Sequence, residues 1–158
     1  MKRIVLVFLI FSLLSCSKND NIQLTEVIKP EIAEKTEVKL IGTWLPKSST
    51  YEYYNEAGLK LHVDSGVSTA TILAFDGTGV KGMQAKFEDS RKYIITNNNG
   101  IETIIIGEPA NVTKFMIKAL TKTAFTFSIS GTYGSYSENG ATKSAATHLA
   151  TFYCTRVK

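Results

Sequence analysis

The chain has few of the residues that form metal sites and nucleophilic active sites. It contains only two cysteines, two histidines, three prolines and one tryptophan among 158 residues. Neither His62 nor His148 has a cysteine or a second histidine at metal-ligand spacing. There is no Gly-x-Ser-x-Gly elbow, and Gly77-Thr78-Gly79 lacks the lysine and the helix that a phosphate loop requires. The sequence therefore predicts no catalytic residue, no metal and no cofactor.

An excess of charge of one sign is also missing. The chain has 18 basic and 14 acidic residues, and without Lys2 and Arg3 the balance falls to 16 against 14. No cluster of lysine and arginine occurs, so the electrostatic footprint of a nucleic-acid-binding protein is absent. Nucleic acid is therefore not an expected partner.

The one long apolar run stands at the N-terminus. Lys2 and Arg3 precede it, and it extends from Ile4 to Leu14 with one interruption at Ser12. A membrane-spanning helix needs about 20 apolar residues. A secretory signal has a basic start and an apolar stretch of roughly 7–15 residues. Residues 1–15 are therefore predicted to be a secretion signal.

The run ends in Leu13-Leu14-Ser15-Cys16. This tetrapeptide resembles the lipobox of bacterial lipoproteins, which implies cleavage after Ser15 and a diacylglycerol on the thiol of Cys16. Two or more acyl chains anchor a protein stably to a membrane. The stretch Ser17-Lys18-Asn19-Asp20 is similar to the export signals of Bacteroidota lipoproteins. The resemblance implies a lipid-anchored protein of the outer membrane, on its periplasmic face or at the cell surface, with the membrane as partner.

The second cysteine, Cys154, has no intramolecular partner once Cys16 carries lipid, so no internal disulfide is expected. Such a cysteine is intermolecular, reactive or simply buried. Cys154 lies in an apolar alternation near the C-terminus, and free cysteines are among the most buried residues. A buried position is the favoured interpretation.

The remaining chain divides at about residue 38. Residues 16–38 are rich in Lys, Asn, Asp, Glu and Thr, with Pro30 in the middle, and are predicted to be the lipidated cysteine and a flexible linker. Residues 39–158 show short runs of period-2 alternation between Gly, Asn and Asp clusters, which is typical of an all-β domain.

The alternation predicts eight or nine antiparallel strands and a loose loop over residues 134–142. The expected strands are 40–53, 59–63, 70–75, 80–87, 92–96, 101–106, 112–120, 124–133 and 145–156. Pro46 predicts a bend, and Asn99-Gly100 predicts a tight hairpin because both residues tolerate positive φ. Sequential hairpins with one apolar face indicate an up-and-down barrel, which has no exposed edges because it closes on itself. A monomer is expected.

Four stretches resemble the lipocalin-like lipoproteins of Bacteroidota: Gly42-Thr43-Trp44, Phe75-Asp76-Gly77-Thr78, the unit from Phe115 to Phe127, and Phe152–Val157. The Thr-Asp-x-x-Tyr motif of true lipocalins is absent, so the chain is similar to the outlying lipocalin-like group. The resemblance implies an eight-stranded barrel. It also implies that Arg156 lies across Trp44 and closes one barrel end, a cation–π pairing.

Period-2 parity assigns an apolar inner face to the barrel. The candidate ligand-lining residues are Leu73, Phe75, Phe115, Ile117, Phe125, Phe127 and Phe152. They can fill the barrel or line an apolar pocket, and a filled core is what any barrel needs.

Two functions therefore stay open. One is a barrel that binds a small apolar or amphipathic ligand. The other is a filled-barrel structural or protein-interaction lipoprotein that acts through its loops. A cavity of a few hundred Å³ would favour the ligand.

Overall fold

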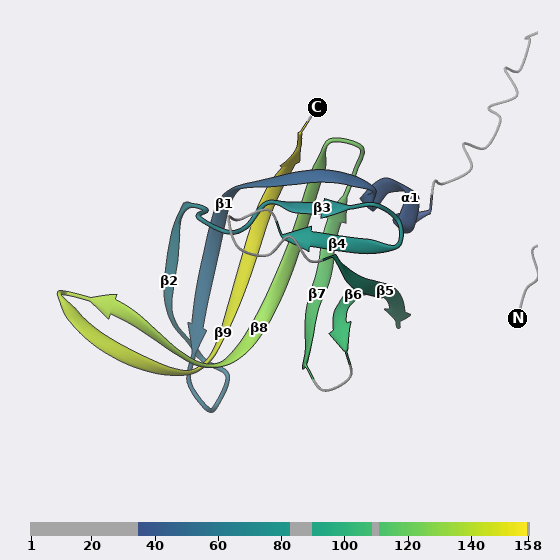
Figure 1. Cartoon of the computed structure of the whole chain (residues 1–158). Coiled ribbons are helices and arrows are strands. Elements are labelled where there is room, and N and C mark those ends of the chain that lie inside the picture. The colour runs from purple at the N-terminus through teal and green to yellow at the C-terminus, as the bar shows by residue number, and fades with distance from the viewer. Residues whose placement is uncertain (1–34, 83–89, 109–110, 158) are drawn as a thin grey trace, which may run out of the picture. The chain divides into compact units, whose positions relative to one another are not determined.

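The computed structural model describes residues 35–82, 90–108 and 111–157, which belong to one compact unit, Ala33–Lys158 (Figure 1). Within them lie one short helix and nine strands. In chain order these are α1 (Thr36–Leu40), β1 (Gly42–Tyr54), β2 (Lys60–Val67), β3 (Leu73–Phe75), β4 (Gly79–Gly82), β5 (Arg91–Asn98), β6 (Ile101–Glu108), β7 (Asn111–Leu120), β8 (Ala124–Glu138) and β9 (Ala141–Arg156). Cys16, with the predicted signal and most of the predicted linker, lies outside the described residues.

Every pairing is antiparallel, and β9 returns to pair with β1. The order β1-β3-β4-β5-β6-β7-β8-β9 therefore closes on itself. The prediction of an all-β, eight-stranded antiparallel barrel of lipocalin-like type is confirmed, with β2 as one additional strand.

Strands β2 and β3 share one neighbour, β1. The first half of β1 pairs with β3 over Gly42–Trp44, and the second half pairs with β2 over Ser48–Tyr54. Both run in the same direction, one after the other, along the side of β1 that does not pair with β9. The predicted bend at Pro46 coincides with a register shift between Pro46 and Ser48 against β9. Proline has no N–H to donate, which is why it interrupts a regular ladder.

The predicted loop over residues 134–142 is wrong. Strand β8 continues to Glu138 and β9 begins at Ala141, joined by a two-residue turn at Asn139-Gly140. These two residues have φ of 53° and 78°, the positive values that tight hairpin turns need. Ser, Gly and Tyr concealed the strand because they give little apolar alternation. The Asn-Gly pair was the available signal.

Two other boundaries differ from expectation. The last residues of the predicted linker form α1, and Leu40, expected to open the first strand, ends this helix and is fully buried. The predicted strand 80–87 is described only as far as Gly82, where β4 ends, and residues 83–89 lie outside the described residues.

Local turn chemistry explains the two predicted turns. The Asn99-Gly100 turn has φ of 52° and 83° and joins β5 to β6. Between β3 and β4, the Asp76 carboxylate accepts hydrogen bonds from the backbone N–H groups of Thr78 (2.9 Å) and Gly79 (2.7 Å). These bonds lower the pKa of Asp76, because they favour the ionised carboxylate.

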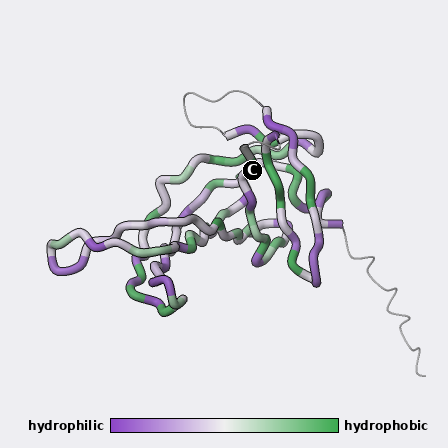
Figure 2. Tube along the Cα trace, turned by 90° about the horizontal axis from the view of Figure 1, so that it is seen from below, coloured by the Kyte–Doolittle hydropathy of each residue, from purple (hydrophilic) through white to green (hydrophobic). Residues whose placement is uncertain are grey.

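Apolar side chains gather in one main core inside the barrel. Its buried members are Leu40, Trp44, Phe75, Val80, Ile104, Ile106, Phe115, Phe125, Phe127, Ala150, Phe152 and Cys154. A second, smaller cluster contains Tyr53 of β1 with Tyr136 and Ala145 of the β8–β9 hairpin. Figure 1 shows this hairpin extending away from the barrel. Figure 2 shows that this projecting hairpin carries few strongly hydrophobic residues along most of its length.

Candidate functional site

The centre of the barrel is filled by a stack of aromatic rings. Phe127 stacks on Phe115, Phe125 and Phe152, with ring centroids 4.6, 5.0 and 5.1 Å apart. Phe75 meets Phe125 edge-on at 6.3 Å. All five rings are at most 8% exposed. These predicted lining residues therefore contact one another and fill the part of the barrel interior where they stack.

The two aliphatic members of the predicted set lie at the margin of this stack. Leu73 and Ile117 are only partly buried and pack against the core. Leu73 faces a pocket toward one mouth of the barrel, whereas Ile117 lines a separate surface depression beside Thr36 and Glu102. The predicted phenylalanines thus fill the barrel centre, whereas Leu73 lines the pocket and Ile117 lines the surface depression.

The pocket that Leu73 faces has a volume of about 290 Å³. Its lining residues are Thr71, Leu73, Val80, Gly82, Arg91, Ile106, Thr113 and Phe115. Two of its lining residues, Ile106 and Thr113, are paired with each other near the end of β6 and the start of β7. Ligand pockets of proteins have volumes of about 300–1,000 Å³. This pocket is at the lower limit of that range.

The chemistry of the pocket is mixed. Phe115 and Ile106 form its apolar floor and are 7% exposed each. Arg91 is exposed and brings a guanidinium to the wall, directly across from Val80 in the β4–β5 ladder. An apolar floor with one cationic group suits a small ligand that has an apolar body and a polar or anionic end.

Trp44 and Arg156 lie opposite each other where β1 begins and β9 ends. The indole of Trp44 is fully buried and donates a hydrogen bond from Nε1 to the carbonyl of Leu40 at 2.8 Å. The guanidinium of Arg156 lies 4.4 Å from the centroid of the Trp44 ring. The expected contact between these two residues is therefore present, within the range of about 6 Å at which cation–π attraction acts.

Arg156 also ties the helix to the barrel. Its guanidinium donates to the carbonyl oxygens of Lys39 and Ile41. Gly42 makes room for this arrangement, because a Cβ on Gly42 would lie 2.6 Å from Nη1 of Arg156. Gly42 also has φ of 133°, a conformation that residues with a side chain rarely adopt. The Gly-x-Trp motif is thus explained by the space that the arginine needs.

The two histidines meet at the second aromatic cluster. Tyr53 lies between them, with ring centroids 6.1 Å from His62 and 6.5 Å from His148. His62 stacks on Tyr136 at 4.6 Å and pairs with Asp64 at 2.9 Å. The arrangement is a packed cluster. In the described part of the chain, no three His, Cys, Asp or Glu side chains are grouped to hold a metal ion.

Glycines give the His148 imidazole its position. Its Nδ1 lies 3.1 Å from the carbonyl oxygen of Tyr133. A Cβ on Gly131 would lie 2.3 Å from the imidazole, and one on Gly134 would lie 3.3 Å from it. Both glycines are on β8, directly beneath the ring. Sequence reasoning did not find this cluster, because its members are far apart along the chain and meet only where the hairpin leaves the barrel.

Cys154 occupies the position expected for it. Its side chain is 3% exposed in the main core, and burial raises the pKa of its thiol to about 12. The thiolate is the reactive form of cysteine. Cys154 therefore stays protonated near neutral pH and acts as an apolar core residue.

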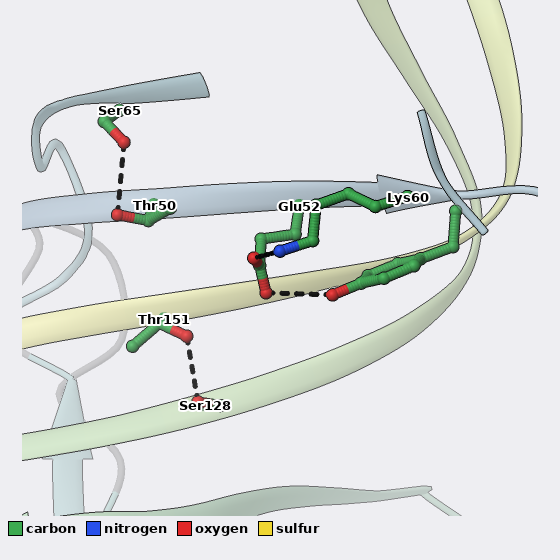
Figure 3. Close-up of polar contacts among 7 residues, drawn as sticks. Thr50, Glu52, Lys60, Ser65, Ser128 and Thr151 are labelled. Carbon is green, nitrogen blue, oxygen red and sulfur yellow. Dashed lines mark hydrogen bonds and ion pairs between the residues drawn. The ribbon is translucent and has the colours of Figure 1, made fainter. Parts of the chain in front are cut away.

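Polar side chains form short links between neighbouring strands (Figure 3). Glu52 pairs with Lys60 and accepts a hydrogen bond from the Tyr54 hydroxyl at 2.9 Å. The bond from Lys60, followed by that from Tyr54, lowers the pKa of Glu52. The buried Ser128 hydroxyl lies 3.0 Å from that of Thr151. The Glu52–Lys60 and Ser128–Thr151 contacts each link side chains of two neighbouring strands of the sheet.

Searches of protein-family models, curated proteins and solved structures found no match to this chain. Among the described residues, no helix is both long enough and apolar enough to cross a membrane. The candidate ligand pocket is therefore described from its geometry alone.

Sequence reasoning missed four residues of this pocket: Val80, Ile106, Arg91 and Thr113. Arg91 was hard to find because the pairing of β4 with β5, which brings it to the pocket, involves only two residue pairs.

Proposed function

We propose that this chain is a lipid-anchored, non-catalytic lipoprotein of the outer membrane, related to the lipocalin-like lipoproteins of Bacteroidota. Its barrel holds a small amphipathic ligand at one mouth. The observation that carries the ligand is the pocket of about 290 Å³ with an apolar floor and the Arg91 guanidinium on its wall. Because the ring stack fills the barrel centre, the ligand is small and sits above Phe115.

Native mass spectrometry of the chain purified from its host tests for a natural ligand. We expect a bound small molecule that is released on unfolding. A chain that carries no adduct when it is purified without organic solvent would count against the ligand.

A titration with the fluorescent probe 1-anilinonaphthalene-8-sulfonate tests the pocket itself, since this probe has an apolar body and an anionic group. Thr113→Trp should fill the pocket and abolish saturable binding. Arg91→Gln should weaken it about tenfold, the loss of one charge-assisted contact of about 1.4 kcal/mol. Lys114→Gln is the matched control, because it removes the same charge from an exposed neighbour of Thr113. Equal binding by all variants would place the probe elsewhere and refute the pocket.

The anchor is tested separately. Radiolabelled palmitate should be incorporated into the wild-type chain and into a Cys154→Ala variant. A Cys16→Ala variant should take up no label and should leave the membrane fraction, because its acyl chains are missing. Label retained by Cys16→Ala would refute lipidation at this residue.

The filled centre supports a second candidate, a lipoprotein that acts by protein contacts and has no small-molecule ligand. Phe75, Phe115, Phe127 and Phe152 occupy the space that a ligand would need deeper in the barrel. Binding of neither a natural ligand nor the probe in the pocket would favour this candidate.

A further inference from the structure

Strand β2 has a free edge. Among the described strands its only neighbour is β1, with residue pairs from Tyr54↔Lys60 to Ser48↔Val67. Every other strand of the sheet has a neighbour on both sides, because β9 closes on β1. Figure 1 shows β2 beside β1 at the margin of the sheet. Seven of its eight residues are exposed. The free edge offers backbone N–H and C=O groups for a further strand.

This edge has few of the features that normally discourage pairing. Proteins protect edges with proline, with a bulge or with charges. Strand β2 has no proline, and its two charged residues, Lys60 and Asp64, pair with Glu52 and His62. Its register irregularity is confined to the first residues, opposite Tyr53 and Tyr54. Apolar side chains are exposed along the strand instead: Leu61 is 40% exposed, Val63 46% and Val67 86%, and Leu59, just before the strand, is 65% exposed.

The β8–β9 hairpin holds β2 from one face and leaves the other free. Tyr136 of the hairpin stacks on His62, with the two ring planes only 12° apart. Side chains alternate between the two faces of a strand, so Val63, Ser65 and Val67 lie on the face opposite His62. The edge is therefore ordered before any partner arrives, which lowers the entropy cost of binding.

We propose that two copies of this chain associate through β2, antiparallel, about a two-fold axis at Val63. Residues equally distant from Val63 then lie opposite each other. The apolar residue Leu59 meets Val67 of the second copy, and Val63 meets its own counterpart. The two sheets become one continuous sheet across the interface. The expectation of a monomer assumed a barrel without edges, and β2 supplies an edge.

Charge selects this axis. With the axis at Val63, His62 lies opposite Asp64 of the second copy. The two side chains already contact each other within one chain at 2.9 Å, so the same side chains of both copies can share hydrogen bonds across the interface. An axis at His62 would place two imidazoles together, and an axis at Asp64 would place two carboxylates together, which is destabilising. The strand is thus most complementary to itself when centred on Val63.

Sedimentation velocity of the full chain in detergent tests the association. We expect a monomer–dimer equilibrium over about 1–100 µM, the weak affinity of a small interface. Val63→Lys should be monomeric over the same range with an unchanged thermal midpoint. The new ammonium group lies opposite Glu52 within the monomer but opposite its own copy in the dimer. Ile94→Lys is the control, since Ile94 is 60% exposed on β5 and should leave the equilibrium unchanged.

Disulfide cross-linking in the membranes of expressing cells tests the axis. Opposed residues of antiparallel strands have Cα atoms about 4.5–5.5 Å apart, within the range of a disulfide. Val63→Cys should therefore form a covalent dimer on mild oxidation. Ile94→Cys and the wild-type chain, which has only Cys16 and the buried Cys154, should not.

Three results would each overturn the proposal. The first is cross-linking of Val63→Cys no faster than that of Ile94→Cys. The second is a dimer that persists unchanged in Val63→Lys. The third is a purified monomer that carries a co-purifying peptide on β2 in place of a second copy. The pocket assays with Thr113→Trp are independent of this interface, so failure of either idea leaves the other testable.

Discussion

Arg156 connects three parts of the fold with one side chain. Its guanidinium lies over the Trp44 indole and donates to the carbonyl groups of Lys39 and Ile41, so the last strand, the first strand and the helix meet there. The backbone of Gly42 passes directly beneath the guanidinium. The contact between Arg156 and Trp44 therefore depends on a glycine at position 42, because a side chain there would collide with the guanidinium.

Gly42→Ala should therefore destabilise the protein. The alanine Cβ would have to displace Arg156, and φ of 133° is strained for any residue with a Cβ. Strain of this kind costs about 1–3 kcal/mol, and the loss should appear as a lower urea midpoint followed by Trp44 fluorescence. Gly66→Ala is the control, because Gly66 has no atom within 4 Å of an added Cβ and no positive φ. A Gly42→Ala variant as stable as Gly66→Ala would show that the arginine moves without cost.

The β8–β9 hairpin is the element whose behaviour differs most from that of the barrel. Beyond Gly131 and His148 its two strands pair mainly with each other, and its side chains are largely exposed. It is held against the rest of the molecule by Tyr136, which is 8% exposed and lies 5.2 Å from the Tyr53 ring. The hairpin therefore depends on a few aromatic contacts, and elements with few buried contacts open locally.

Tyr136→Ala should release the hairpin and leave the barrel intact. Hydrogen exchange of backbone amides in residues 134–145 should become at least tenfold faster, whereas amides of β6 and β7 should be unchanged. Tyr133→Ala provides the comparison, because Tyr133 is 84% exposed. Equal exchange in the two variants would mean that the strand ladder alone holds the hairpin.

At the scale of the whole molecule, the ring stack makes the barrel one cooperative unit. Phe127 from β8 contacts rings from β7 and β9, and Phe125 extends these contacts to Trp44 on β1 and Phe75 on β3. Strands β1, β3, β7, β8 and β9 therefore share one set of contacts. Loss of any central ring is expected to weaken all of them together.

Phe127→Ala should lower the free energy of unfolding by about 3–5 kcal/mol, the usual loss for a buried phenylalanine. Trp44 fluorescence and far-ultraviolet circular dichroism should shift together in a urea titration, since two-state unfolding makes different probes coincide. Tyr153→Ala, at a neighbouring position on β9 with 45% exposure, should change stability by less than about 1 kcal/mol. Separate transitions for the two probes would indicate that the closed end unfolds independently.

Much of the fold could be predicted because its information is local. Alternating apolar residues gave the strands and their inner faces, and Asn99-Gly100 identified a hairpin by its backbone preference. The candidate site was harder to predict. Arg91 and Thr113 reach one pocket from β5 and β7, and nothing in their local sequence distinguishes them from surface residues.

The sequence by itself determined the all-β architecture and the buried set of phenylalanines, because both follow from the period-2 alternation of strands. The position of Trp44 near Arg156 was implied by the resemblance to lipocalin-like lipoproteins. Only the tertiary structure decided that the phenylalanines plug the barrel, that a small pocket remains at one mouth and that β2 keeps a free edge. The physical reason is that filling and pairing depend on contacts between strands distant in sequence, which no single segment encodes.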